Sequence, residues 1–412
     1  MERVVITGMG VVSPIGNDVE SFWNNMIAGN SGITKINTFD TADLRVKIAG
    51  SIKNFDAEKA IGKKAARNLD RFVQFALAAA DQAWNDSKLG ESDLDRERLA
   101  VYVGSGVGGI ETLIDGLHAL HQKGPRRVSP SLVPSMMSNA AAAQISIKWQ
   151  AMGPSMSPVS ACAIGNTAIG EAYRLIRMGE ADAAFAGGTE AGITELSIAS
   201  FGNATALSTR NESPAQASRP FDATRDGFVM AEGAGILILE SLTHAKQRGA
   251  SIYAEIVGYG ASSDAYHIVA THPEGQGAYL AMKRAVQQAG IETHDIDVIS
   301  AHATSTIVGD QSETRAIRKL FEEHANKLPV TANKSMLGHM LGAAGGAEAI
   351  ALAKCLQEGI IPPTINLEIE DPMCDLDYVA EGARSVELEY GLSNSFGFGG
   401  HNAAIVLKKY MD

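Results

Sequence analysis

The chain has 412 residues, 45% hydrophobic and 20% charged, which is typical of a folded protein with a large core. Its net charge of −12 argues against nucleic-acid binding, and no apolar run approaches the ~18 residues that a membrane-spanning helix requires, so we expect neither nucleic acid nor membrane as a partner. The start of the chain is typical of a strand rather than a secretion signal, and three scattered cysteines without metal-binding spacing favour a reducing cytoplasm and no bound metal.

Strands and helices alternate along the first part of the chain. Apolar runs predict buried strands at residues 3–7, 99–103, 181–188 and 235–240, and helical periodicity predicts helices at residues 67–86 and 137–149. Glycine clusters at residues 8–10 and 104–109 partly match a dinucleotide-binding loop. No acidic residue closes a following strand at the usual spacing, so we favour tight glycine turns that let the backbone approach a neighbour.

The second part of the chain repeats this order. Strands are predicted at residues 252–260, 296–302 and 330–332, and helices at residues 276–289 and 342–357. Two final strands, 391–395 and 402–407, flank a glycine-rich loop at residues 396–400. The repeated order indicates an internal duplication built from βαβ units with largely parallel sheets.

Cys162 lies among residues with little side-chain bulk. The segment before it is compatible with an extended strand, and a helical pattern begins at Ile164. The free N–H groups and the dipole at a helix N-terminus favour a thiolate, which is the nucleophilic form of cysteine. A buried structural thiol is the alternative reading of this residue.

Two histidine loops follow predicted strands in the second part of the chain. His302 comes directly after one strand, and His339 follows Lys334 within the next loop. Each histidine alone is compatible with an ordinary hydrogen-bonded loop residue. Because ligands bind at the carboxyl ends of parallel strands, we expect the two loops to contribute to one site.

Cys162, His302, Lys334 and His339 together resemble the active-site set of the β-ketoacyl-acyl-carrier-protein synthases, in the thiolase superfamily. The chain is most similar to the elongating type II enzymes of bacterial fatty-acid synthesis, and the resemblance covers essentially its whole length. The matching stretches are residues 4–8, 104–109, 124–127, 160–163, 225–229, 263–267, 334–339 and 394–400.

The resemblance implies an α/β, thiolase-like duplicated fold with five layers, α-β-α-β-α, and two mixed sheets. Residues 1–250 would form an N-terminal half that carries the nucleophilic cysteine. Residues 251–412 would form a C-terminal half that carries the histidines, the lysine and a gating glycine loop. The family is homodimeric, so we expect a symmetric dimer.

The family's reaction is a decarboxylative Claisen condensation. By resemblance, Cys162 takes an acyl chain from acyl carrier protein, and malonyl-carrier protein then loses CO2 and attacks the thioester. The N–H groups of Cys162 and Phe398 would stabilise the first oxyanion, and His302 and His339 would hold the malonyl thioester oxygen. Lys334 would support the histidines electrostatically, paired with Glu348.

Further positions match family roles in binding. Thr304 and Thr306 match the contacts to the pantetheine arm, and Val107 and Phe201 match the acyl pocket. Phe398 also matches a gating residue. We expect no cofactor of the protein's own, because phosphopantetheine of the carrier protein holds the substrates. Exposed basic residues that otherwise read as a solvated face match the carrier-protein dock: Lys64, Arg67, Arg126 and Arg127.

The sequence departs from the family pattern at four positions: Ala303 stands for glycine, Leu337 and Val269 for threonine, and Ala163 for threonine or serine. These changes leave chain-length preference open, as well as the choice between fatty-acid synthesis and a dedicated polyketide or polyene pathway. A coenzyme A thiolase is the second reading, but neither Cys355 nor Cys374 lies in the glycine motif of a second thiolase cysteine. A non-catalytic chain-length partner is the third, and Cys162 argues against it.

Overall fold

The computed structural model describes residues 1–411. Within that range, ten strands form one mixed sheet in the order β10-β9-β13-β14-β8-β1-β7-β6-β4-β5. One half of the sheet consists of β5 (Ser155–Met156), β4 (Leu99–Gly104), β6 (Ala183–Glu190), β7 (Gly233–Ser241) and β1 (Val4–Val12). The other half consists of β10 (Val330–Thr331), β9 (Val298–Ser300), β13 (Tyr390–Gly397), β14 (His401–Lys409) and β8 (Ala254–Ser263).

The two halves have the same topology. In each, three strands run parallel, β5-β4-β6 and β10-β9-β13, and two antiparallel strands follow, β7-β1 and β14-β8. This repetition confirms the predicted duplication and the thiolase-like α/β fold. The two predicted sheets are not separate, however, because β1 and β8 pair over three residues, from Val4 to Ile6.

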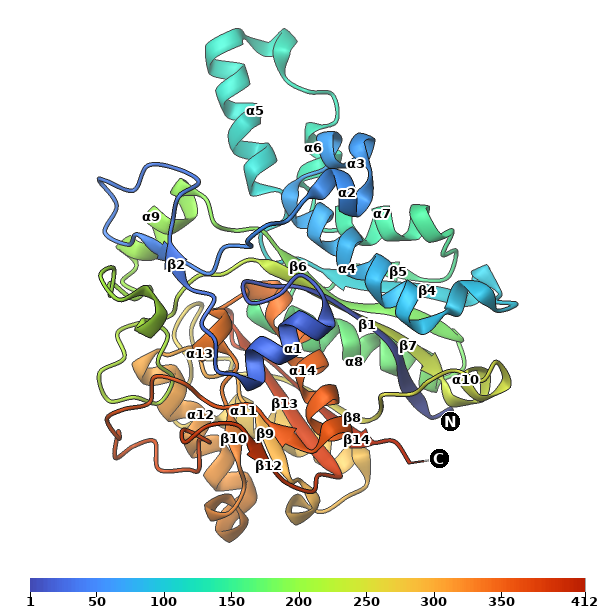
Figure 1. Ribbon diagram of the computed structural model, residues 1–412, viewed down its shortest axis with the longest axis vertical. Helices are drawn as coiled ribbons and strands as arrows, with labels where there is room; N and C mark the ends of the chain where they lie inside the picture. The colour runs from blue at the N-terminus through green and yellow to red at the C-terminus, as the bar shows by residue number, and fades with distance from the viewer. Residues whose placement is uncertain (412) are drawn as a thin grey trace.

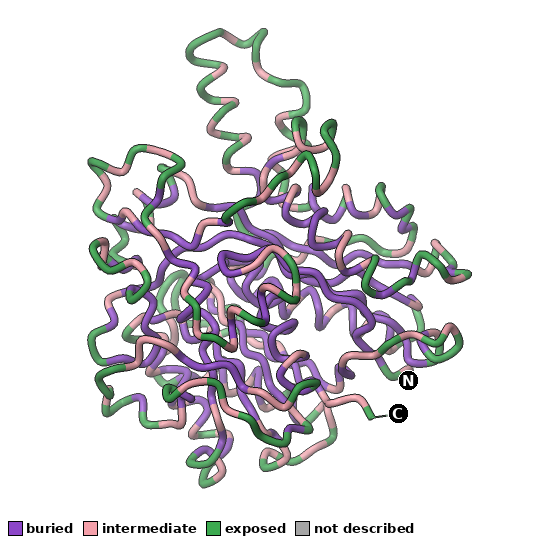
Figure 2. Tube along the Cα trace, viewed as in Figure 1, coloured by how far each residue is buried: buried purple, intermediate pink, exposed green. Residues whose placement is uncertain are grey.

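Helices lie on both sides of each half and between them (Figure 1). α4 (Arg71–Ser87) packs on β1 and β7, and α11 (Gln276–Ala289) packs on β8 and β14. α8 (Ile164–Arg177) and α14 (Ala344–Glu358) form a central layer that contacts strands of both halves. The result is the expected α-β-α-β-α order, and Figure 2 shows that the buried residues are concentrated in these central layers.

Other helices connect these layers. They are α1 (Val19–Ile27), α2 (Ala57–Ile61), α3 (Lys63–Asn68), α5 (Ile110–Lys123), α6 (Leu132–Met136), α7 (Ala140–Trp149), α9 (Glu195–Asn203), α10 (Leu242–Gln247), α12 (Ile307–Phe321) and α13 (Lys334–Leu337). Two short ribbons complete the fold: β2 (Thr34–Lys35) with β3 (Ile48–Ala49), and β11 (Ile360–Ile361) with β12 (Arg384–Ser385). Among residues 1–411, each helix is too short or too polar to cross a bilayer.

The helix predicted at residues 67–86 begins later, at Arg71. The carboxylate of Asp70 caps it by accepting hydrogen bonds from the N–H of Phe72 and, across the loop, from Thr112. The preceding basic residues instead form α3. A capping carboxylate in an extended conformation ends the upstream helix and starts the next one.

The glycines at positions 8 and 10 do not form a turn, contrary to the sequence-based expectation. They lie inside β1, where a Cβ atom would come within 2.2 Å of the Ala83 carbonyl oxygen and 1.9 Å of the Ala79 carbonyl oxygen. The second half mirrors this arrangement, because Gly258 in β8 lies equally close to α11. Bare backbone therefore lets each outer helix lie directly on its strand.

The second glycine cluster binds a carboxylate of the protein itself. The N–H groups of Gly106 and Val107 donate to the buried Glu190 at 2.9 and 3.1 Å. Because these donors would have to face a pyrophosphate in a dinucleotide site, the pairing excludes that reading.

Candidate active site

Cys162 lies in a single 3₁₀ turn, Ala161–Ala163, directly before α8. This is the strand-to-helix setting expected from the sequence. Ala161 has a φ of +51°, in the left-handed region that side chains disfavour, and thereby turns the cysteine toward the cavity. Gly165, in the first turn of α8, lies against α14, where a Cβ would be 2.4 Å from the Gly346 nitrogen. This close crossing places the cysteine next to the second half of the molecule.

Burial controls the protonation of this thiol. It raises the pKa of Cys162 to about 11, although the Lys334 ammonium and the backbone N–H groups of Phe398 and Cys162 act in the opposite direction. The expectation that the helix N-terminus makes a thiolate is therefore wrong. Desolvation outweighs the helix dipole here. The same two N–H groups that act on the sulfur are those expected to form the oxyanion hole.

His302 and His339 face one another across the cavity. Their rings are nearly perpendicular, with centroids 5.3 Å apart. The backbone N–H of His302 donates to the Glu313 carboxylate at 2.9 Å, and the backbone N–H of His339 donates to the Val229 carbonyl at 2.7 Å. Burial, followed by the charge of Lys334, lowers the pKa of both imidazoles well below 6.5. Both rings are therefore neutral at physiological pH.

Lys334 and Glu348 form a buried ion pair beyond the histidines. Each side chain is 1% exposed, and the lysine Nζ donates to the Glu348 Oε1. Burial raises the pKa of Glu348 to about 7, while Lys334 opposes this shift. The pair matches the expected partnership, and Glu348 contacts the lysine rather than the substrate cavity.

One cavity of about 510 Å³ brings the expected groups together. Its lining includes Cys162, His302, His339 and Phe398, together with the four residues expected to bind substrate: Val107, Phe201, Thr304 and Thr306. Phe398 is 38% exposed, and its ring lies 6.3 Å from that of Phe201. A thiol from the first half and two imidazoles from the second thus share one cavity.

The loop that carries Phe398 rests on the cysteine turn. A Cβ at Gly397 would lie 2.9 Å from the Cys162 nitrogen, so glycine permits this close approach. Beyond Phe398, Gly399 and Gly400 have φ values of +83° and +74°. The Gly399 N–H donates to the Ile268 carbonyl at 2.7 Å, which ties the loop to residues 264–272.

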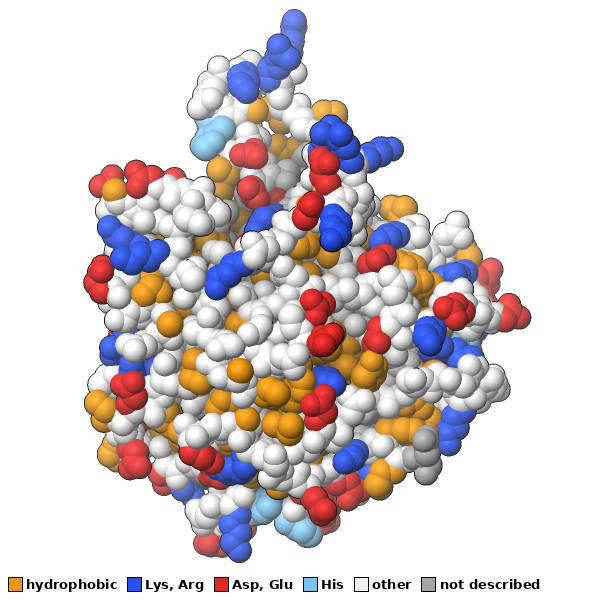
Figure 3. Space-filling model, in the orientation of Figure 1, with side chains coloured by type: hydrophobic (Ala, Val, Ile, Leu, Met, Phe, Trp, Pro, Cys, Tyr) orange, Lys and Arg blue, Asp and Glu red, His pale blue; other side chains and the backbone are white. Residues whose placement is uncertain are grey.

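The basic residues expected to receive the carrier protein lie outside the cavity. Lys64 and Arg67 are exposed on α3, and Arg126 and Arg127 are exposed in the 3₁₀ turn Pro125–Arg127 after α5. Figure 1 shows α5 projecting at the top of the molecule and the chain returning from it, as a hairpin, to α6 beside α3; basic side chains gather on this projection in Figure 3. Arg67 and Arg127 line a polar cleft of about 550 Å³ between these elements.

Sequence reasoning missed the buried carboxylates that shape the site. Glu190, at the end of β6, holds the Gly106 loop, and Glu313 on α12 accepts from the N–H groups of His302 and Ala303. Asp310 and Glu313 share the buried face of α12 with Ile317. Carboxylates at helical spacing among apolar residues were the available signal, because charges are rarely buried without partners.

The fold and this cavity define a condensing acyltransferase of the thiolase type. The chain matches the family described as beta-ketoacyl synthase, N-terminal domain, over residues 1–245, and its C-terminal domain over residues 253–368. The protein therefore belongs to the β-ketoacyl synthase family.

Two curated relatives are about half identical to this chain over its whole length. The chain is 51% identical to a Staphylococcus aureus protein named 3-oxoacyl-(acyl-carrier-protein) synthase 2, over 99% of both chains. It is 47% identical to a protein of the same name from Synechocystis, over 99% of this chain and 98% of the relative.

Solved structures agree with this assignment. A type II polyketide ketosynthase in complex with its acyl-carrier protein superposes with a TM-score of 0.93 at 36% identity, covering all of both chains. A beta-ketoacyl synthase from Burkholderia phymatum superposes with a TM-score of 0.93 at 35% identity, again over both whole chains.

Proposed function

We propose that this protein elongates acyl chains in type II fatty-acid synthesis, condensing malonyl-acyl-carrier protein with an acyl group held on Cys162. The observation that carries the proposal is the shared cavity, in which the Cys162 thiol, two neutral imidazoles and the N–H groups of Cys162 and Phe398 converge. The fatty-acid assignment draws on the names of the relatives that are about half identical over the whole chain.

The first half-reaction transfers the acyl group to sulfur. The thiol is protonated because its pKa is raised, so its proton passes to the pantetheine sulfur of the carrier protein as that sulfur leaves the acyl group. The Lys334 charge and the backbone N–H groups of Phe398 and Cys162 favour the sulfur anion that attacks. The N–H groups of Cys162 and Phe398 donate to the developing thioester oxyanion. Both donors already lie at the sulfur, so little rearrangement is needed.

The second half-reaction generates a carbanion equivalent from the malonyl group. As CO2 leaves, negative charge develops on the malonyl thioester oxygen, and neutral imidazoles at positions 302 and 339 donate hydrogen bonds to it. Burial, together with the Lys334 charge, lowers the pKa of both rings and so keeps them neutral. The carbanion carbon then attacks the acyl thioester, which releases the Cys162 thiolate. No resident cofactor takes part in these steps.

The substrate reaches the cavity on a carrier protein. We place its acidic surface on Lys64, Arg67, Arg126 and Arg127, and its pantetheine arm along Thr304 and Thr306. The solved ketosynthase in complex with an acyl-carrier protein supports such a partner for a protein of this fold. We further propose a homodimer that works in the cytoplasm.

The test is intact-mass measurement after incubation with acyl-carrier proteins of graded chain length. Wild type gains the acyl mass, Cys162→Ala does not, and the matched control Cys355→Ala, which alters a cysteine buried in α14, still does. Addition of malonyl-carrier protein then releases a product two carbons longer. A wild-type protein that gains no acyl mass refutes the proposal. Selective use of poly-β-ketoacyl chains assigns the enzyme to a dedicated polyketide or polyene pathway instead.

A further inference from the structure

The Arg225 side chain is completely buried beside the His302 loop, and its guanidinium donates to three backbone carbonyls. The side chain is 0% exposed. Nε donates to the Thr306 carbonyl at 3.2 Å and Nη2 to the Ile307 carbonyl at 3.0 Å, while Nη1 donates to the Asp222 carbonyl at 2.7 Å. The carboxylates of Asp310 and Asp371 lie 3.3 and 2.9 Å from the guanidinium.

The two carbonyl groups that Arg225 holds at the start of α12 belong to residues of the active-site cavity. Thr306 and Ile307 line it, and they follow a strained loop in which Ala303 and Ser305 have φ values of +36° and +68°. Non-glycine residues persist in this region only where neighbours hold them. Here Glu313 accepts from the Ala303 N–H, Asp310 accepts from the Ser305 N–H, and Arg225 clamps the end of the loop.

The segment that begins at Arg225 also holds the second histidine. The Gly227 N–H donates to the Ser305 carbonyl at 3.2 Å, which anchors the segment to the first loop. Further along, the Val229 carbonyl accepts from the His339 N–H, and the Phe228 ring lies 5.4 Å from the His339 ring. One short stretch of chain therefore spans the distance between the two imidazoles.

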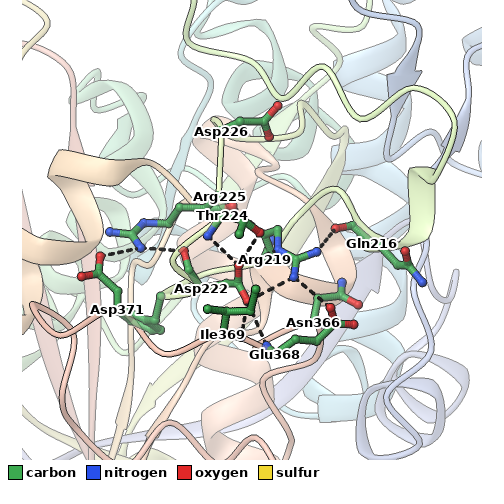
Figure 4. Close-up of polar contacts among 12 residues, drawn as sticks. Gln216, Arg219, Asp222, Thr224, Arg225, Asp226, Asn366, Glu368, Ile369 and Asp371 are labelled. Carbon is green, nitrogen blue, oxygen red and sulfur yellow. Dashed lines mark hydrogen bonds and ion pairs between the residues drawn. The ribbon is translucent and has the colours of Figure 1, made fainter.

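Figure 4 shows how this anchor is fixed from outside. Arg225 and Asp371 point toward one another on one side, and a second pair, Arg219 with Asp222, lies on the other. The Arg219 side chain contacts Asp222, Glu368 and the Gln216 carbonyl, none of which lies in a histidine loop. The two arginine side chains are alike in burial and pairing but differ in what they hold. The backbone N–H of Arg219 donates to the Ser305 hydroxyl at 3.0 Å, and a lysine at position 219 keeps that bond.

We propose that Arg225 is a positioning residue for the second half-reaction, one that sets the placement of the His302–Thr306 loop relative to His339. This inference rests on the proposed function. Cys162 is held by other parts of the chain, namely its 3₁₀ turn, α8 and the Gly397 backbone. Arg225 therefore serves malonyl decarboxylation and condensation, while acyl transfer to Cys162 does not depend on it.

The test compares Arg225→Lys with Arg219→Lys in the full-length protein. Lysine keeps the charge but has three donors on one atom and cannot span the carbonyls that the guanidinium fork reaches. A displacement of about 1 Å costs roughly 100-fold in rate. We expect Arg225→Lys to lower the rate of malonyl-carrier-protein decarboxylation and condensation about 100-fold, with Cys162 acylation changed less than about threefold.

The control separates this role from lost stability. Arg219→Lys is expected to lower the melting temperature comparably while leaving the ratio of the two half-reactions at the wild-type value. Asp371→Asn, which keeps a hydrogen-bonding oxygen beside Arg225, provides a milder variant that should shift the ratio in the same direction as Arg225→Lys. Equal losses in both half-reactions, or the same ratio in Arg225→Lys and Arg219→Lys, overturn the inference. Failure of wild type to acylate Cys162 refutes the proposed function instead.

Discussion

The buried pair Lys334–Glu348 yields a quantitative prediction. Removing one partner leaves an uncompensated charge at a site that is 1% exposed, which costs about 3–5 kcal/mol of unfolding free energy. Lys334→Met and Glu348→Leu each meet this condition. The double variant replaces both charges with apolar side chains of similar volume, so it should regain most of the loss and lie within about 1 kcal/mol of wild type.

The assay is a double-mutant cycle by denaturant unfolding, with thermal melting alongside. For a 412-residue chain, an unfolding entropy of about 0.9 kcal/mol per degree converts 4 kcal/mol into a shift of roughly 4–5 °C. Lys354→Met is the matched control, because its more exposed partner Glu358 stays solvated and the loss should be below about 1 kcal/mol.

Two outcomes would refute the reasoning about this pair. One is single variants that unfold within about 1 kcal/mol of wild type. The other is a double variant no more stable than the singles. Activity gives a separate readout, since the double variant should fold normally yet condense more slowly, because the Lys334 ammonium, which adds to burial in lowering the pKa of His302 and His339, is gone.

Three further predictions concern the histidine loops and the carrier dock. Ala303→Gly relieves a φ of +36° and should raise the unfolding free energy by up to about 1 kcal/mol, whereas the control Ala301→Gly, in ordinary backbone, should lower it. Thermal melting measures both changes, and a lower melting temperature for Ala303→Gly contradicts the backbone strain. Because the pKa of both imidazoles is lowered, the unfolded chain takes up protons below about pH 6.5 that the native state does not, so the unfolding free energy should fall with falling pH by about 1.4 kcal/mol per pH unit per ring. Urea unfolding of His302→Asn should show a shallower dependence of that free energy on pH. An unchanged pH dependence counts against neutral rings. The double variant Arg126→Glu, Arg127→Glu should raise KM for acyl-carrier protein about tenfold at low salt and less at high salt, whereas the control Lys246→Glu on α10 should leave KM unchanged. If steady-state kinetics show no salt dependence of this change, the carrier protein does not bind at this hairpin.

Local patterns in the sequence sufficed for the order of elements. Helical periodicity after Cys162 predicted α8, and the repeated strand–helix order predicted the duplication that the sheet topology shows. The cysteine, both histidines and Lys334 were selected because their surroundings matched a family pattern over the whole chain. These features depend on short segments whose character is fixed by neighbours in sequence.

Long-range partners could not be predicted. The glycines of β1 were read as a turn because the helix that requires them, α4, is about 70 residues away. The pKa of Cys162 is raised, whereas the helix start predicted that it would be lowered. The direction of the shift depends on burial of the sulfur and not on the helix N-terminus alone. Glu190 likewise gains its role from backbone N–H groups of a loop 83 and 84 residues earlier in the chain.

The central claim is that the thiol of one half and the imidazoles of the other act in the same cavity. The most direct measurement is a single-turnover chase in which acylated enzyme is mixed with malonyl-carrier protein and the acyl mass on the protein is followed. The account predicts rapid loss of that mass in wild type, and normal loading but persistent acyl-enzyme in His302→Ala and His339→Ala. If those two variants discharge their acyl groups into elongated product as fast as wild type, the imidazoles do not serve the chemistry at Cys162.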